Sequence, residues 1–239
     1  MQERFYRKWV QENNLIGFEV KVKETDLFIR ADKNLANEAR VLVVKYRNIL
    51  KEYLRDNPVF LKSLVPVEIK STAPIFVQEM VNASCKAGVG PMASVAGVIA
   101  EFVGKELLTF SKEILVENGG DIFLKTLQKR TVAIYAGKSP LSGKIGIEIT
   151  PEMGVVGVCT SSGKVGHSLS FGCADSVTVI SKSAILADAW ATSLANRVKS
   201  SSEIEEVLKY ASEIKGIRGV VIIVDEKIGF TGKIRILKV

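Results

Sequence analysis

The sequence contains only three cysteines and one histidine among its 239 residues. The cysteine spacings match no zinc site, and their odd number does not suit a small secreted domain held together by disulfides. This usage favours a reducing cytoplasm. The N-terminal residues MQERFYRKWVQENN also lack the apolar stretch of a signal peptide. We therefore expect a cytoplasmic protein.

Long runs of like charge and long uncharged apolar runs are also missing. The 33 basic and 26 acidic residues give a net charge of +7, with the basic residues spread along the chain. No basic block and no interleaved aromatic–basic motif occurs, so we expect no nucleic-acid partner. The most apolar segment, residues 91–110, contains Glu101, Lys105 and Glu106. These charges favour a buried helix over a membrane span, and we expect no membrane partner.

The chain shows no fixed-period repeat and no low-complexity linker, which excludes a solenoid and predicts one compact body. Its hydrophobic fraction of 47% suffices for a large core. The order of expected elements repeats loosely, with two strands, two or three helices and two strands in each half. We therefore expect a single α+β domain over residues 1–239, duplicated as halves of about 1–127 and 128–239, with antiparallel sheets and helices on one sheet face.

Hydrophobic periodicity and turn residues place the individual elements. The expected strands cover residues 17–23, 26–31, 113–117, 121–125, 131–136, 145–150, 155–160, 176–181, 219–225 and 233–239. The expected helices cover residues 35–56 after the cap Asn34, 74–87, 91–110, 184–198 and 203–214. Residues 65–70 are expected to be a short extended run.

The most informative stretch is residues 159–196. A loop rich in Ser and Gly, with the only histidine, precedes a short strand and an Ala-rich helix. Such a loop exposes backbone N–H groups, which bind phosphates. The helix carries Asp188 and Thr192 four residues apart among apolar neighbours, and a carboxylate and a hydroxyl at this spacing can hold a cation. The stretch predicts a site for a small anionic, phosphorylated ligand and a divalent metal.

Each candidate also has a plainer interpretation. Residues 160–166 can be a flexible loop, and turn chemistry alone explains Gly119 and Gly120 beside Asp121. His167 is a candidate general base because the pKa of histidine lies near neutrality, although a lone histidine is commonly structural. Its candidate partner Asp175 is suggested only by proximity along the chain.

The cysteines are open to two interpretations. Cys159 and Cys173 flank the loop, either as small buried hydrophobic residues or as sulfur carriers whose thiol pKa is lowered by Lys164 and His167. Cys85 lies on a helix face, where we expect it to be in the core and less reactive.

Four segments in a fixed order resemble the ApbE family, once called thiamine-biosynthesis lipoproteins and known as flavin transferases. They are GVGPMASVAG (88–97), ENGGDIFL (117–124), CTSSGKVGHSLSFGCADSVTV (159–179) and ADAWATSLAN (187–196). They are similar to the family's GAIAKG-type helix, GGD turn, TSG loop and AD…AT helix. The chain looks like a small branch related to this family, and the resemblance covers nearly its whole length.

The resemblance implies two tandem T-fold-like halves, an FAD pocket between them, and Mg²⁺ held by Asp188 and Thr192. The candidate catalytic residues are His167 and Asp121. The candidate cofactor-binding residues are Gly97, Gly119, Gly120, Thr160, Ser161, Ser162 and Gly163. The implied activity is the transfer of FMN from FAD to a protein threonine.

Two departures from the ApbE pattern keep other functions open. The family's Lys-Gly pair is Glu101-Phe102 here, which removes a cation from the expected flavin site, and its longer histidine segment is shortened to residues 167–170. One alternative, known only by family, is a sulfur-assimilation factor in homocysteine biosynthesis beside an iron–sulfur partner. Another is a non-catalytic protein for an anionic small molecule. The sequence leaves open whether the chain is an enzyme and whether it forms a homo-oligomer.

Overall fold

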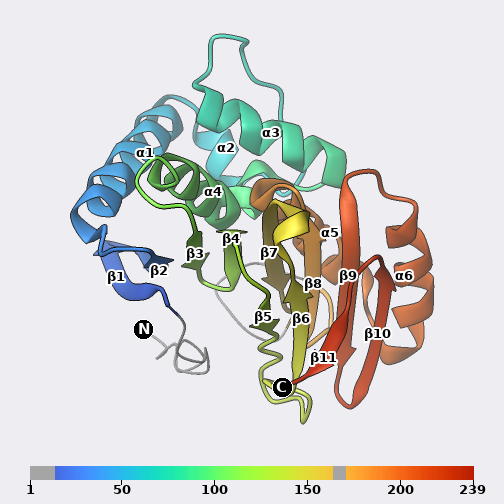
Figure 1. Ribbon diagram of the computed structural model, residues 1–239. Helices are drawn as coiled ribbons and strands as arrows, with labels where there is room; N and C mark the ends of the chain where they lie inside the picture. The colour runs from blue at the N-terminus through green and yellow to red at the C-terminus, as the bar shows by residue number, and fades with distance from the viewer. Residues whose placement is uncertain (1–13, 164–170) are drawn as a thin grey trace.

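The structure is a computed structural model that describes residues 14–163 and 171–239. These residues form three layers, with helices on one face of an eight-stranded sheet and a three-stranded sheet on the other face (Figure 1). The expected α+β class is confirmed. The T-fold interpretation and the division into halves at residues 127 and 128 stay predictions.

The eight-stranded sheet is antiparallel throughout. Its strands are, in spatial order, β1 (Ile16–Val22), β2 (Thr25–Ala31), β3 (Ile114–Asn118), β4 (Asp121–Lys125), β7 (Val155–Ser161), β8 (Ser176–Ser181), β9 (Ile217–Val224) and β10 (Lys227–Gly232). The β4–β7 pairing, with Ile122 opposite Val158, joins the first four strands to the last four.

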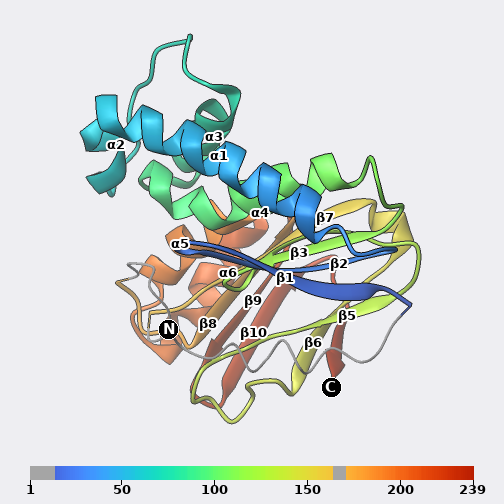
Figure 2. The same ribbon diagram turned by 90° about the vertical axis from the view of Figure 1, so that its left-hand side faces the viewer.

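The helices cover one face of this sheet, as Figure 2 shows from the side. They are α1 (Ala36–Asp56), α2 (Pro58–Lys62), α3 (Ile75–Ala87), α4 (Val95–Leu107), α5 (Ala184–Arg197) and α6 (Ile204–Ser212). Short 3₁₀ turns at Pro91–Ser94 and Ser201–Glu203 precede α4 and α6. Alternate strand residues such as Val177, Val179 and Ile222 face this layer and belong to the main core.

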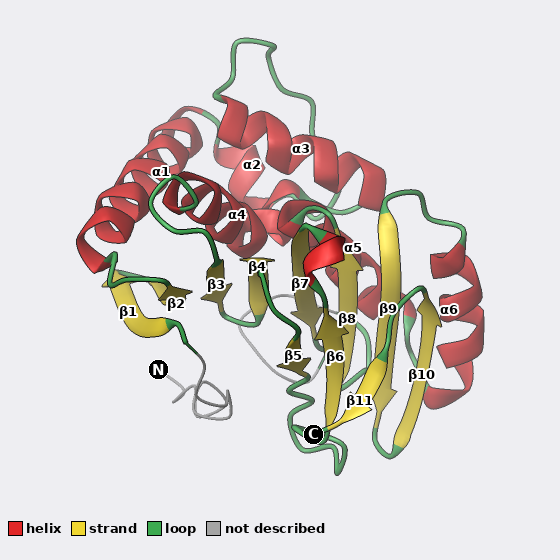
Figure 3. Cartoon of the chain, viewed as in Figure 1, coloured by secondary structure: helices red, strands yellow, loops and turns green. Residues whose placement is uncertain are grey.

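The smaller sheet consists of β5 (Arg130–Ala133), β6 (Ile145–Ile149) and β11 (Ile236–Lys238), in the order β11-β6-β5 (Figure 3). It covers the opposite face of the large sheet and forms a second core. Ile147 and Ile149 of β6 pack there with Val158 and Ile180. Strands β7 and β8 are therefore largely buried on both faces.

Some expected elements are wrong at their ends. Residues 233–239 do not form one closing strand, because β10 occupies 227–232 in the large sheet and β11 occupies 236–238 in the small sheet. β10 has the sequence KIGFTG, whose two glycines give little strand propensity, so its pairing with β9 decides its conformation. The short helix α2, which starts at Pro58, was also not expected.

Within residues 14–163 and 171–239 no single helix is long and apolar enough to cross a membrane. The segment 91–107 and α3, which meet at a bend of 105°, reach the required length and composition only when they are taken together.

A buried ion pair ties the end of the β3–β4 hairpin to β5. Arg130 donates to Glu113 Oε2 at 2.8 Å, and the side chains are only 8% and 3% exposed. The same carboxylate oxygen accepts from the Thr126 hydroxyl and from the amide of Leu127. These bonds satisfy Glu113 away from water.

We expect Glu113→Ala to lower the free energy of unfolding by about 3–5 kcal/mol, because Arg130 would remain buried and unpaired. Urea unfolding followed by circular dichroism measures the change. The exposed pair of Arg55 and Asp56 offers a control, since both side chains are largely in solvent. Asp56→Ala should leave the unfolding midpoint unchanged, and an equal loss in both variants would contradict this assignment.

Candidate functional site

The candidate site lies where α4 and α5 cross. Gly97 makes this contact close, because a Cβ atom there would lie 2.5 Å from the Ala184 carbonyl oxygen and 2.8 Å from Asp188 Cβ. The amide of Gly97 donates to Asp188 Oδ2 at 2.8 Å. Asp188 therefore accepts from the first turn of α4, where helix amides have no partner within the helix.

Helix α5 is buried nearly all round, which its Ala-rich sequence permits. Ser183 caps the helix by accepting from the amide of Leu186. Asp188 and Thr192 are only 8% and 7% exposed. The ordinary alternative for Asp188, an acidic residue on a solvated helix face, is therefore excluded.

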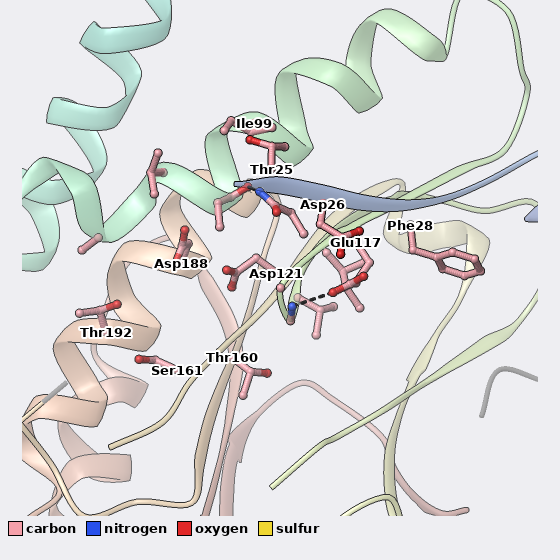
Figure 4. Close-up of a pocket in the computed structure, with 18 of the residues that line it drawn as sticks. Thr25, Asp26, Phe28, Ile99, Glu117, Asp121, Thr160, Ser161, Asp188 and Thr192 are labelled. Atoms are coloured by element: carbon pink, nitrogen blue, oxygen red, sulfur yellow. Dashed lines mark hydrogen bonds between the residues drawn. The ribbon is translucent and has the colours of Figure 1, made fainter. Parts of the chain in front are cut away.

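A large cleft opens beside this crossing, with a volume of about 2200 Å³. Asp121, Ser161, Asp188 and Thr192 all line it and gather at one place (Figure 4). We call these four residues the acidic centre. They come from β4, β7 and α5, so the centre depends on both groups of strands.

The turn between β3 and β4 presents Asp121 to the cleft. Gly119 and Gly120 have φ angles of 69° and 104°, a conformation that glycine adopts without strain. Glu117 accepts from the amide of Gly120 at 2.9 Å, and Asn118 donates to the Ala96 carbonyl at 3.1 Å (Figure 4 shows the first bond). The turn is thus tied to the start of α4.

The acidic centre holds two buried carboxyl groups whose pKa values are raised. Burial raises the pKa of Asp188 to about 7, although hydrogen bonds from the amides of Gly97 and Ala96 act in the other direction. Burial and the neighbouring Asp188 raise the pKa of Asp121 well above its usual range. Among the described residues, Asp121 Oδ1 and Ser161 Oγ are buried without a hydrogen-bond partner. Unpartnered oxygens beside two acids suit a cation.

Most of the sequence-predicted site residues come together. Gly119, Gly120 and Asp121 line the cleft with Thr160, Ser161, Ser162, Asp188 and Thr192. Gly97 lies behind the site and holds Asp188. Gly163 is packed inside its own loop, where a Cβ atom would lie 1.9 Å from the Gly172 carbonyl.

The structure does not test the prediction for His167. His167, with Lys164, falls outside the described residues. Asp175, its candidate partner, accepts from the amide of Asp225 at 2.6 Å.

Sequence reasoning missed the contacts that hold the Gly-Gly turn and the place of Glu101 and Phe102. Glu117 and Asn118 shape the Gly-Gly turn, and their place directly before it was the only available signal. Glu101 and Phe102 do not line the cleft, so they do not face it as the expected loss of a flavin-site cation required. Phe102 instead packs against Tyr46 and Phe76 in the helical layer.

The prediction that Cys85 lies in the core is wrong, and the buried interpretation of Cys159 is confirmed. Cys85 is exposed, whereas Cys159 is buried and donates to the Ala184 carbonyl at 3.3 Å. Burial, with Asp121 and Asp188 nearby, raises the pKa of the Cys159 thiol. Cys159 is therefore a packing residue.

No group of three or more His, Cys, Asp or Glu side chains suited to a metal ion occurs in the part of the chain that the structure describes.

The sequence matches the family described as AbpE bacteria over residues 7–235. A UPF0280 protein of Methanocaldococcus jannaschii is 43% identical over 219 residues, which cover 89% of each chain. The fold is similar to that of apo flavinyl transferase ApbE of Pseudomonas stutzeri, with a TM-score of 0.57 at 14% identity, covering 92% of this chain and 94% of that one. For flavin transferase ApbE of Vibrio cholerae the TM-score is 0.55 at 16% identity, covering 91% and 96%. The resemblance to ApbE is confirmed at the level of fold.

The pKa of Asp188 gives the first prediction from the site. The folded protein keeps a proton on this group up to about pH 7, whereas the unfolded chain releases it near 3.8, so the free energy of unfolding falls as pH rises between these values. We expect Asp188→Asn to remove this penalty and to gain on the order of 2–4 kcal/mol relative to the parent between about pH 4 and pH 8. Urea unfolding without divalent ions measures it. Identical pH slopes for both proteins would contradict the raised pKa.

The reactivity of the cysteine thiols gives the second prediction from the site. With iodoacetamide we expect Cys85 to react first in the native protein, because it is exposed. Cys159 should react only after unfolding, since it is buried and only a thiolate attacks. Peptide mass spectrometry over time measures the order. Labelling of Cys159 in the folded protein at the rate of Cys85 would contradict its burial.

Proposed function

Because this chain belongs to the AbpE bacteria family, we propose that its cleft binds a phosphorylated, flavin-type ligand such as FAD together with a divalent cation. The supporting observation is the acidic centre, where two buried carboxyl groups with raised pKa values face hydroxyl groups in one cleft. Once deprotonated, the two acids and a phosphorylated ligand would repel each other unless a cation lies between them.

The residues fit a hard cation such as Mg²⁺. Asp188 and Thr192 supply a carboxylate and a hydroxyl, and the unpartnered Ser161 Oγ lies close to them (Figure 4). Mg²⁺ takes about six oxygens, so water and ligand phosphate would complete the set. A bound cation would supply charge neutralisation and polarisation of a phosphoryl group.

The cleft also fits a ligand of dinucleotide size. Typical small-molecule pockets measure about 300–1,000 Å³, and this cleft exceeds that range. Apolar side chains such as Met92 and Ile99 line it, and so do the lysines Lys51, Lys62 and Lys129. Apolar walls suit aromatic rings, and the lysines suit phosphate.

We extend the proposal to transfer of FMN from FAD to a hydroxyl group of an acceptor, as a flavin transferase would do. The acceptor oxygen forms a bond to the phosphorus on the flavin side, and the bond from that phosphorus to the AMP oxygen breaks. Asp121, whose Oδ1 is unpartnered and whose pKa is raised, takes the proton of the hydroxyl group. AMP leaves.

The other candidate functions have less support. A non-catalytic binding protein would use the same cleft without an acceptor. The sulfur-transfer alternative loses one of its two candidate residues, because Cys159 is buried and its pKa is raised. The proposal also includes a cytoplasmic location and a protein partner, and both rest on the sequence.

We expect FAD with Mg²⁺ to stabilise the protein by about 2.7 kcal/mol at a ligand concentration of ~100 times Kd. This corresponds to a rise in Tm of roughly 2–4 °C per kcal/mol. FAD without a divalent ion should give little shift. Differential scanning fluorimetry and calorimetric titration measure both.

Three variants separate the roles of the residues. Asp188→Asn should abolish the cation-dependent shift, whereas Asp121→Asn should keep cation-dependent binding and lose transfer to an acceptor. Glu148→Gln, on β6 beside the exposed Arg235, is the control and should behave as the parent. No shift with FAD plus Mg²⁺ would refute the flavin ligand, and a parent-like Asp188→Asn would refute the cation site.

A further inference from the structure

Glu101 is a buried carboxylate that the proposed chemistry does not use. It lies on α4 and is only 3% exposed. Its Oε2 accepts from the Ser183 hydroxyl at 2.8 Å and from the amide of Ile185 at 3.2 Å. Its Oε1 pairs with Lys105 at 2.7 Å. Glu101 thus binds the N-terminal turn of α5, where amides lack helical partners.

The two helices therefore cap each other. Asp188 of α5 accepts from Gly97 at the start of α4, and Glu101, one turn further along α4, accepts at the start of α5. Two hydrogen bonds join the helices, one from Gly97 to Asp188 and one from Ile185 to Glu101. Together with the backbones of α4 and α5, they form a closed ring across the helix contact. A closed ring fixes both the rotation and the sliding of α5 against α4.

We propose that Glu101 is a positioning residue that sets the orientation of the Asp188 carboxylate in the cleft. The expected effect of Glu101 on cation binding rests on the proposed function, which places a cation at Asp188. The geometric part of the proposal, that Glu101 keeps Asp188 on the amide of Gly97, stands without it.

The choice of residue follows from the geometry. The first turn of α5 offers an amide and a hydroxyl as donors, so the partner must be an acceptor. The Lys-Gly pair expected from the ApbE pattern has no side-chain acceptor and would face these donors with a positive charge. A carboxylate is also favoured by the helix dipole at this end. Glu101 therefore suits the contacts of this chain, and it affects the site through α5, the helix that carries Asp188.

The experiment compares Glu101→Ala with Glu101→Gln. The alanine variant loses the acceptor, whereas the glutamine variant keeps an acceptor oxygen and loses only the charge. We expect Glu101→Ala to weaken Mn²⁺ binding by about 10–100-fold, the usual effect of losing a residue that holds a metal ligand in place. Glu101→Gln should restore most of the affinity. Calorimetric titration and electron paramagnetic resonance of Mn²⁺ measure binding well below Tm.

A second measurement reports on position without any metal. Hydrogen exchange of the Gly97 amide, followed by NMR, should become faster in Glu101→Ala and stay slow in Glu101→Gln. If the parent protein fails to bind Mn²⁺, the proposed cation site fails, and this exchange measurement still decides whether Glu101 positions Asp188.

Leu107→Ala is the matched control for general destabilisation. Leu107 is fully buried near the end of α4, away from the ring. This variant should lose stability and keep the parent's Mn²⁺ affinity and Gly97 protection. Two results would overturn the proposal: a folded Glu101→Ala protein with parent-like Gly97 exchange, or an equal loss of binding in Leu107→Ala.

Discussion

The close crossing of α4 and α5 is the contact on which the rest of the structure depends. Gly97 has no side chain, so the α5 backbone at Ala184 can come near enough for each helix to place an acid on the other's free amides. The crossing joins the first group of strands to the last group above the β4–β7 pairing. This contact holds the first and last groups of strands in a fixed position, and the cleft with its two carboxyl groups depends on it.

The sequence was sufficient for much of this arrangement, because the relevant signals are local. Alternation of apolar residues predicted β7 and β8, and the i, i+4 spacing of Asp188 and Thr192 correctly placed them on one helix facing the 160–162 segment. The Asn118-Gly119-Gly120 turn was equally legible, since few residues adopt positive φ angles.

The features that the sequence did not predict are set by distant partners. From the sequence, Glu101 was noted only because it replaces a lysine of the ApbE pattern. Its hydrogen bonds to Ser183 and Ile185, 82 and 84 positions away, show that it caps α5. Cys85 was expected in the core and is exposed, because burial of a short side chain depends on which helix face is covered. β10 and β11 divide between two sheets, which no pattern within residues 227–239 specifies.

The bond between Gly97 and Asp188 spans 91 residues of sequence, and this separation has a consequence for the order of folding. Contacts between residues so far apart form late, because closing a long loop costs entropy before the contact contributes. The hairpins β1–β2 and β3–β4 can pair before α5 has been synthesised, but Asp121 is the one residue of the acidic centre that they hold. A growing chain therefore cannot assemble the acidic centre until its second half has folded onto the first, so a complete cleft marks the completed molecule.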